Sequence, residues 1–190
     1  MSSRDAILAA LEKVKVPHMA MPKITIEPNN QDLAGQYLEM IAKVGGTAIE
    51  VTSLVQVQDY LNDKISANEQ VLSLVDGVSG NRQLDAQQHD LHNVDLALVP
   101  AKFGVAENGA VYVSSQDTGH RVTPFIAENL AALLRRSDLV ANMHEAVKQV
   151  ELNSGELGSF IAGPSKTADI EQALVIGAHG ACSMTIFLID

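Results

Sequence analysis

Residues 184–189 read Met-Thr-Ile-Phe-Leu-Ile, an apolar run interrupted by one threonine. Two other stretches have the same character, Val-Leu-Ser-Leu-Val at 71–75 and Val-Asp-Leu-Ala-Leu-Val at 94–99. A strand that is apolar at nearly every position is typical of a sheet whose two faces are both covered by helices. These stretches therefore predict a buried and largely parallel β-sheet.

Segments with helical spacing lie between these strands. The apolar residues at 33, 37, 38, 41 and 44 mark one helix face, which Gly45-Gly46 ends, and residues 54–65 predict another helix. Alternating strands and helices indicate an α/β fold with a mostly parallel sheet covered by helices. The other expected elements are strands at 47–51, 110–113, 139–141 and 159–162 and helices at 126–134, 143–150 and 168–175.

The first thirty residues are predicted to form an arm. Ile7, Leu8, Leu11 and Val14 recur at helical spacing. The prolines at 17, 22 and 28 then exclude a helix interior from the next segment. We expect an N-terminal helix and proline-containing connector over 1–30 and a single α/β domain over 31–190.

Composition excludes several classes of function. The 190 residues carry 13 Lys and Arg against 23 Asp and Glu, a net charge of −10, which argues against nucleic-acid binding and a polybasic membrane anchor. No run approaches the roughly 20 apolar residues that span a bilayer, and no signal peptide is evident, so a cytoplasmic location is expected. The one cysteine, Cys182, excludes an internal disulfide and a Cys-only iron–sulfur or zinc site within one chain.

The loops after strands are the first place to search, because open α/β sheets bind ligands beyond the carboxyl ends of their strands. Gly-Pro-Ser-Lys-Thr-Ala-Asp-Ile-Glu at 163–171 follows a predicted strand and precedes a predicted helix, with Ser165 or Thr167 as its cap. Such a helix start suits a phosphate or carboxylate. A capped helix without a ligand is the simpler interpretation from the residues alone.

Two further positions carry candidate chemistry. Glu107 precedes the hairpin signal Asn108-Gly109 and is either a nucleophile or base or, more simply, a solvated turn residue. His179 is flanked by glycines in a loop, as a site residue or as a strut that pins the loop. His89 and His92 provide too few fixed ligands, so no metal site is predicted.

Three stretches together resemble the lactate-utilisation (LUD) domain family, and within it the lactate-utilisation protein C branch. They are residues 104–115, 137–146 and 163–181 followed by 184–190, together with a proline-containing segment near Pro124. The most specific part is G-P-S-x-T-A-D-I-E followed by G-x-H-G. The resemblance covers residues 94–190 and is only topological over 1–93. It implies the fold of the glucosamine-phosphate isomerase, ribose-phosphate isomerase and CoA-transferase group.

The resemblance also implies a function. It indicates the cluster-free component of a system that oxidises L-lactate to pyruvate, with iron–sulfur clusters only in cysteine-rich partner proteins and no cofactor in this chain. The pocket would bind a small anionic ligand, with Glu107 as a candidate catalytic residue. The implied ligand-binding residues are Asn108, Gly109, Gly163, Pro164, Ser165, Thr167, Asp169, His179 and Gly180.

The sequence departs from the family pattern in two places. The histidine usual after Arg121 and Pro124 is missing, and Ala181-Cys182 stands where Pro-Arg is typical. These losses suggest an altered ligand or weaker activity, because they remove a proton-transfer group and an anion clamp. Two alternatives stay open: a stand-alone CoA-transferase-like enzyme with Glu107 as nucleophile, and a non-catalytic regulatory or scaffold protein.

Overall fold

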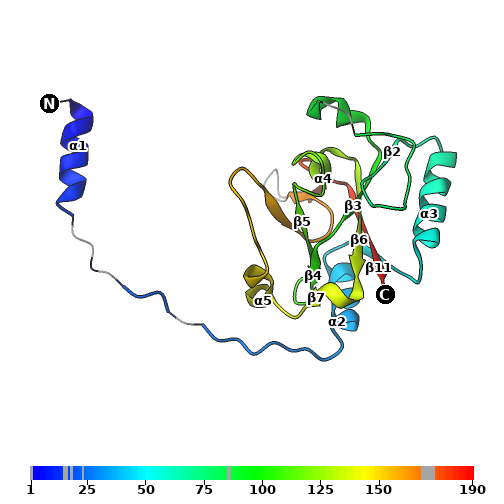
Figure 1. The fold of residues 1–190 in the computed structure, drawn as a ribbon, viewed down its shortest axis with the longest axis horizontal. Coiled ribbons are helices and arrows are strands. Elements are labelled where there is room, and N and C mark those ends of the chain that lie inside the picture. Colours follow the sequence, from blue (N-terminus) through cyan, green and yellow to red (C-terminus); the bar gives the residue numbers. More distant parts are fainter. Residues whose placement is uncertain (1, 15–16, 18, 23, 85–86, 168–173) are drawn as a thin grey trace.

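The computed structural model describes residues 2–14, 17, 19–22, 24–84, 87–167 and 174–190. Within them the main sheet has five strands, all paired in parallel (Figure 1). The predicted α/β class with a mostly parallel sheet is therefore confirmed. In order across the sheet the strands are β1 (Thr47–Val51), β11 (Ser183–Ile189), β6 (Asn129–Arg135), β3 (Leu96–Pro100) and β2 (Val71–Ser73).

Helices cover both faces of this sheet, which explains its continuous apolar strands. On one face Tyr37 and Ile41 of α2 (Leu33–Lys43) belong to the same buried cluster as Ile186 of β11. On the other, Val57 and Leu61 of α3 (Leu54–Ser66) share a cluster with Phe187. Neighbouring residues of β11 thus point into opposite layers of the core, as the pleat of a strand requires.

A second sheet packs beside the first. Its strands are β7 (Leu139–Val140), β4 (Phe103–Val105), β5 (Ala110–Ser114) and β8 (Gly158–Ile161), antiparallel except for the β4–β7 pair. The rings of Phe103 and Tyr112 stack across β4 and β5 with centroids 4.9 Å apart. Ala146 of α5 (Met143–Lys148) is buried in the same cluster, so this sheet has its own small core.

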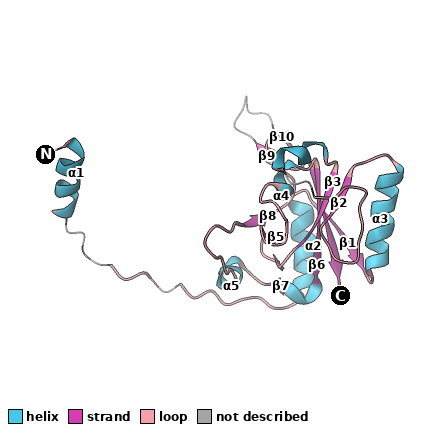
Figure 2. Ribbon diagram, turned by 45° about the horizontal axis from the view of Figure 1, so that its top comes forward, coloured by secondary structure: helices cyan, strands magenta, loops and turns pink. Residues whose placement is uncertain are grey.

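The remaining elements are short. A one-turn helix, α4 (Thr123–Ile126), precedes β6, and the 3₁₀ turns η1 (Gln88–Asn93) and η2 (Arg136–Asp138) lie before β3 and after β6. The strands β9 (Lys166–Thr167) and β10 (Val175–Ile176) pair as an antiparallel hairpin. Figure 2 shows this hairpin at the top of the α/β domain and the C-terminus at its bottom.

One predicted helix is wrong. Residues 126–134 were expected to be helical, but Asn129–Arg135 form β6, between β11 and β3 in the middle of the sheet. Alanine and leucine dominate this segment and favour a helix in isolation. Burial on both faces outweighs that preference, and β6 is paired with β11 along its whole length and with β3 from Asn129 to Leu133.

The helix predicted at 168–175 is also wrong where the structure describes it. Val175 lies in β10, which pairs with β9. Residues 168–173 lie outside the described residues. The sequence interpretation also missed β4, which is only three residues long and follows β3 after a two-residue gap.

The N-terminal arm begins with the predicted helix. The helix α1 (Ser3–Glu12) starts with a capping box, in which Ser2 and Asp5 exchange backbone–side-chain hydrogen bonds. The Ser2 N–H donates to the Asp5 carboxylate and thereby lowers the pKa of that carboxyl, because the bond favours the charged form. No residue of α1 is buried, and Figure 1 shows the helix far from both sheets. Within the described residues, no helix is long and apolar enough to cross a membrane.

Replacing Leu188 with alanine is expected to lower the free energy of unfolding by about 2–5 kcal/mol, because the side chain is fully buried in β11 and leaves a cavity. Urea unfolding followed by circular dichroism measures the change. Leu152→Ala is the matched control, since that leucine is 51% exposed, and should change stability by about 0.5 kcal/mol or less. Equal losses in the two variants would contradict the assignment of β11 to the core.

Tyr37→Phe is expected to stabilise the protein by about 1 kcal/mol at neutral pH. The Tyr37 hydroxyl is buried and has no hydrogen-bond partner in the part of the chain that the structure describes. Its removal therefore relieves the free-energy cost of burying a polar group without a hydrogen bond. Burial also raises the pKa of Tyr37 well above its ordinary value of about 10. The unfolded chain therefore ionises first as the pH rises, and wild-type stability falls there.

The advantage of Tyr37→Phe should consequently grow above a pH of about 10, where the variant lacks this titration. Urea unfolding at neutral and alkaline pH measures both effects. Tyr60→Phe serves as control, because Tyr60 is only partly buried. A destabilised Tyr37→Phe variant would show that the hydroxyl has a partner.

Candidate functional site

Two hollows lie at opposite edges of the parallel sheet. The larger, of about 500 Å³, lies where β3, β6 and β11 end, and we call it the carboxyl-edge hollow. The smaller, of about 250 Å³, lies near the starts of β6 and β11, and we call it the amino-edge hollow. The amino-edge hollow is lined by Pro124, Phe125, Leu130, Phe160, Ile161, Ala162, Gly163, Ser165, His179, Gly180 and Ala181.

Main-chain hydrogen bonds join the two loops that form the polar side of the amino-edge hollow. The Ser165 N–H donates to the Ala181 carbonyl at 2.9 Å, and the Gly177 N–H donates to the Ser165 carbonyl at 3.0 Å. Gly180 lies against Ser165, where a Cβ would approach the serine Cβ to 3.2 Å. The structure thus brings together four of the predicted ligand-binding residues: Gly163, Ser165, His179 and Gly180.

The C-terminal end of α2 fixes the first of these loops. Gly163 has φ +73°, and a Cβ there would lie 2.4 Å from the Val44 carbonyl oxygen, so only glycine fits. The Lys166 ammonium donates to the same carbonyl, which satisfies an acceptor left free at the end of the helix. The buried Pro164 sits between these two contacts and does not line the hollow.

Thr167 does not provide the helix start that the sequence predicted. Thr167 belongs to β9, so its predicted function as a helix cap is wrong. Asp169 lies outside the described residues. At Ser165 the structure has a loop tied to Ala181, and Ser165 and His179 are the residues with polar side chains among those that line the hollow.

Glu107, Asn108 and Gly109 form the turn between β4 and β5, as the hairpin signal predicted. One Glu107 carboxylate oxygen accepts a 2.9 Å hydrogen bond from the Met143 N–H, at the first residue of α5. The Asn108 side chain accepts from the Ala110 N–H at 3.0 Å. Neither Glu107 nor Asn108 lines either hollow, and the catalytic function of Glu107 stays a prediction.

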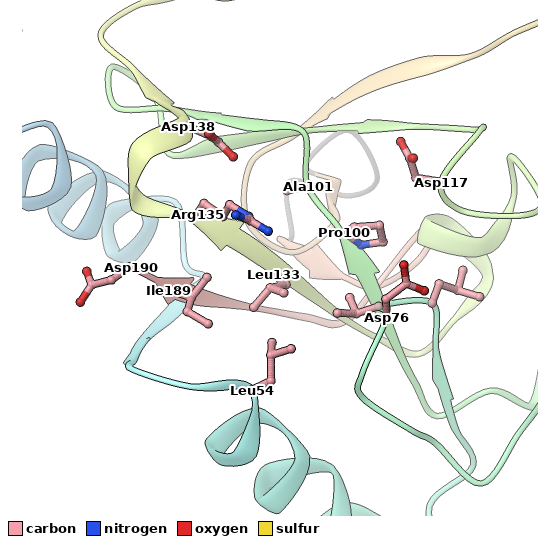
Figure 3. Close-up of a pocket in the computed structure, with 12 residues that line it drawn as sticks. Leu54, Asp76, Pro100, Ala101, Asp117, Leu133, Arg135, Asp138, Ile189 and Asp190 are labelled. Carbon is pink, nitrogen blue, oxygen red and sulfur yellow. The ribbon is translucent and has the colours of Figure 1, made fainter.

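The carboxyl-edge hollow holds a different set of side chains. In Figure 3, Asp138 lies above Arg135, and Asp117 and Asp76 lie to its right. Asp117 forms an ion pair with Lys102 at 2.9 Å. The hollow is lined by Leu54, Leu74, Val75, Asp76, Pro100, Ala101, Asp117, Leu133, Arg135, Asp138, Ile189 and Asp190.

The rim of the carboxyl-edge hollow is tied by Arg136. Its guanidinium contacts Glu50, at the end of β1, and donates to Asp190 at 2.9 Å, after β11. These two carboxylates raise the pKa of Arg136 further above its ordinary value. In the parts of the chain that the structure describes, no three His, Cys, Asp or Glu side chains are grouped closely enough to hold a metal ion.

Comparison with known proteins identifies the family. The LUD domain family model matches residues 56–189, which include four of the five strands of the parallel sheet, all but β1. The chain belongs to the LUD domain family. The resemblance drawn from the sequence motifs is therefore confirmed.

Relatives of this LUD domain protein share most of its length. Lactate utilization protein C of Geobacillus thermodenitrificans is 28% identical over 190 residues, covering 94% of this chain and 76% of the relative. The protein of that name from Geobacillus kaustophilus is 28% identical and covers 82% of this chain and 68% of its own length. Among solved structures, a DUF162 family protein from Deinococcus radiodurans matches with a TM-score of 0.64 at 14% identity, covering 84% of this chain and 97% of that one, which shows the shared fold.

Sequence reasoning missed the carboxyl-edge hollow of the LUD domain for two reasons. It took Arg135 to follow a helix, whereas Arg135 ends the strand β6. It also applied the carboxyl-end rule to β8, which lies in the mostly antiparallel second sheet. A usable signal was present, because Asp76 and Asp190 directly follow apolar runs that were correctly read as strands.

Gly109→Ala in this LUD domain is expected to destabilise the fold more than Gly155→Ala does. Both glycines have positive φ, +68° and +88°, so both variants carry a backbone penalty of about 1–2 kcal/mol. Only at Gly109 would the new Cβ meet other backbone, within 2.8 Å of the Ile41 nitrogen, whereas nothing lies within 4 Å at Gly155. Urea unfolding of both variants measures the difference, and equal losses would contradict the packing of the turn against α2.

Proposed function

We propose that this chain acts in L-lactate utilisation, as the cluster-free component of an iron–sulfur system that oxidises L-lactate to pyruvate. Two findings support the proposal: membership of the LUD domain family over residues 56–189, and relatives named Lactate utilization protein C that align with most of the chain. The amino-edge hollow is its proposed ligand site.

The observation that carries the proposed site is the meeting of Ser165 and His179 at one hollow. A hydroxyl and an imidazole can both hydrogen-bond a small carboxylate, and the imidazole can exchange a proton with a bound hydroxyl group. The lining also contains the apolar side chains of Phe125, Leu130 and Phe160. A small 2-hydroxy or 2-oxo acid offers a matching carboxylate end and methyl end.

The lining residues also suggest how tightly such an acid binds. The amino-edge hollow contains no lysine or arginine among the described residues that line it. Ala181 and Cys182 occupy the positions where the family pattern has Pro-Arg, and Ala181 lines the hollow. A carboxylate there is held by neutral donors and the imidazole, without the bidentate clamp that an arginine gives. We therefore expect weak binding compared with family members that retain the arginine.

In this proposal, partner proteins accept the electrons that lactate oxidation releases. Oxidation of L-lactate to pyruvate releases two electrons and two protons, and the electrons need an acceptor. A single cysteine cannot by itself supply the four thiolates of a typical cluster. In the proposal, cysteine-rich iron–sulfur partner proteins take the electrons, while this chain binds the acid and handles a proton at His179.

His179→Gln is expected to lower lactate-dependent dye reduction by the reconstituted complex at least about tenfold, because a proton-transfer group is lost. Ser165→Ala removes one hydrogen bond and should raise the apparent KM by up to about tenfold. His144→Gln is the matched control, an exposed histidine on α5 outside the amino-edge hollow, and should leave the rate unchanged.

The decisive comparison is the complex with and without this chain. A rate that depends on the chain supports the proposal. Equal rates of lactate-dependent dye reduction in both preparations would contradict an essential function of this chain in lactate oxidation.

A further inference from the structure

The carboxyl-edge hollow has the features of a ligand site that the proposed lactate function does not use. It has twice the volume of the amino-edge hollow, about 500 Å³ against about 250 Å³. Three adjacent parallel strands, β3, β6 and β11, contribute Pro100, Arg135 and Ile189 to it. The carboxyl end of a parallel sheet is the position where open α/β sheets place their ligands.

Arg135 is the group in this hollow best placed to bind an anion. Its side chain is exposed, and the described residues give it neither a hydrogen bond nor an ion pair, whereas the adjacent Arg136 is held by Glu50 and Asp190. Figure 3 shows the Arg135 guanidinium extending into the space between the aspartates. A guanidinium with its donors free binds a carboxylate through two parallel hydrogen bonds.

The start of α3 adds a second favourable contribution for an anion. Leu54, the first residue of α3, lines the hollow. The N-cap Ser53 makes no side-chain capping bond, and the first turn holds no acidic residue, so the positive end of this 13-residue helix is not neutralised from within.

The acidic side chains of the hollow divide into two groups. Asp117 and Asp190 are already paired, with Lys102 and Arg136 respectively. Asp76 and Asp138 have no cationic partner among the described residues, and Asp138 accepts only from the neighbouring Ser137 hydroxyl. Carboxylates accept hydrogen bonds and donate none, so these two require donors on the ligand.

We propose that the carboxyl-edge hollow binds a small polyhydroxylated carboxylic acid, with its carboxylate on Arg135 and its hydroxyl groups on Asp76 and Asp138. A monoanion suits the hollow better than a phosphate dianion, because the two unpaired aspartates outweigh the one unpaired arginine in charge. An apolar acid suits it less, because it would leave both aspartates desolvated without donors.

Isothermal titration of the full chain with D-gluconate tests the site. The wild type should bind, and Arg135→Gln should weaken binding at least about tenfold, because the charged bidentate contact is lost. Arg4→Gln, on the exposed helix α1, is the matched control and should bind as the wild type does. Thermal unfolding of each variant checks that the fold is intact.

A second set of probes tests which side chains recognise the hydroxyl groups. Hexanoate, a carboxylate without hydroxyls, should bind the wild type at least about tenfold more weakly than D-gluconate. Asp76→Asn should weaken the binding of D-gluconate and leave that of hexanoate unchanged, so the difference in affinity between the two acids becomes smaller. Glucose 6-phosphate should bind more weakly than D-gluconate, because Asp76 and Asp138 repel its phosphate dianion.

Three results would overturn the proposal: no D-gluconate binding up to about 10 mM, binding unchanged in Arg135→Gln, or tighter binding of glucose 6-phosphate. The test is separate from the lactate proposal. His179→Gln should leave D-gluconate binding unchanged, and failure of lactate oxidation would not alter the titration.

Discussion

The parallel pairing of β11 with β1 on one side and β6 on the other is the constraint on which the rest of the fold depends. Seven residue pairs join β11 to β6, from Ser183 with Asn129 to Ile189 with Arg135. Because β11 is apolar on both faces, both must be covered, and α2 and α3 occupy opposite faces. The register also decides which residues reach the two edges. It places Arg135 beside Ile189 at one edge and Leu130 beside Met184 near the other.

The helix α2 connects this core to the candidate site. Its face toward the sheet buries Tyr37 and Ile41. Its last turn meets Gly109 of the β4–β5 turn, and its C-cap residue Val44 meets Gly163 of the amino-edge loop. In both places a glycine allows another segment to approach the backbone of the helix more closely than a Cβ permits. Gly109 and Gly163 therefore serve as packing positions, whatever each does toward a ligand.

The sequence was informative where a local pattern and the tertiary environment agree. The apolar runs at 71–75, 94–99 and 184–189 each overlap a strand of the parallel sheet, because burial on two faces favours an apolar residue at nearly every position. It was misleading at 126–134, where alanine and leucine favour a helix in isolation. Only the neighbours of β6, which are distant in sequence, decide between helix and strand.

The same limit explains what was found and missed in the candidate sites. Gly163, Ser165, His179 and Gly180 lie in loops with a distinctive motif, and they meet in space as the family resemblance implied. Arg135, Asp76 and Asp138 belong to no motif that the sequence reading recognised. They come together only because three strands end side by side, an arrangement that requires the strand order.

The two hollows share the strand β6. Leu130, near the start of the strand, lines the amino-edge hollow, and Arg135, at its end, lines the carboxyl-edge hollow. Five residues of extended chain separate these positions by about 16 Å. That separation is about twice the screening length of physiological salt, so a charge bound at one exposed rim has little direct influence at the other. The backbone between Leu130 and Arg135 is hydrogen-bonded to β11 on one side and, as far as Leu133, to β3 on the other, so the distance between the two hollows is fixed. A small acid bound at one opening therefore exerts only a weak electrostatic effect at the other.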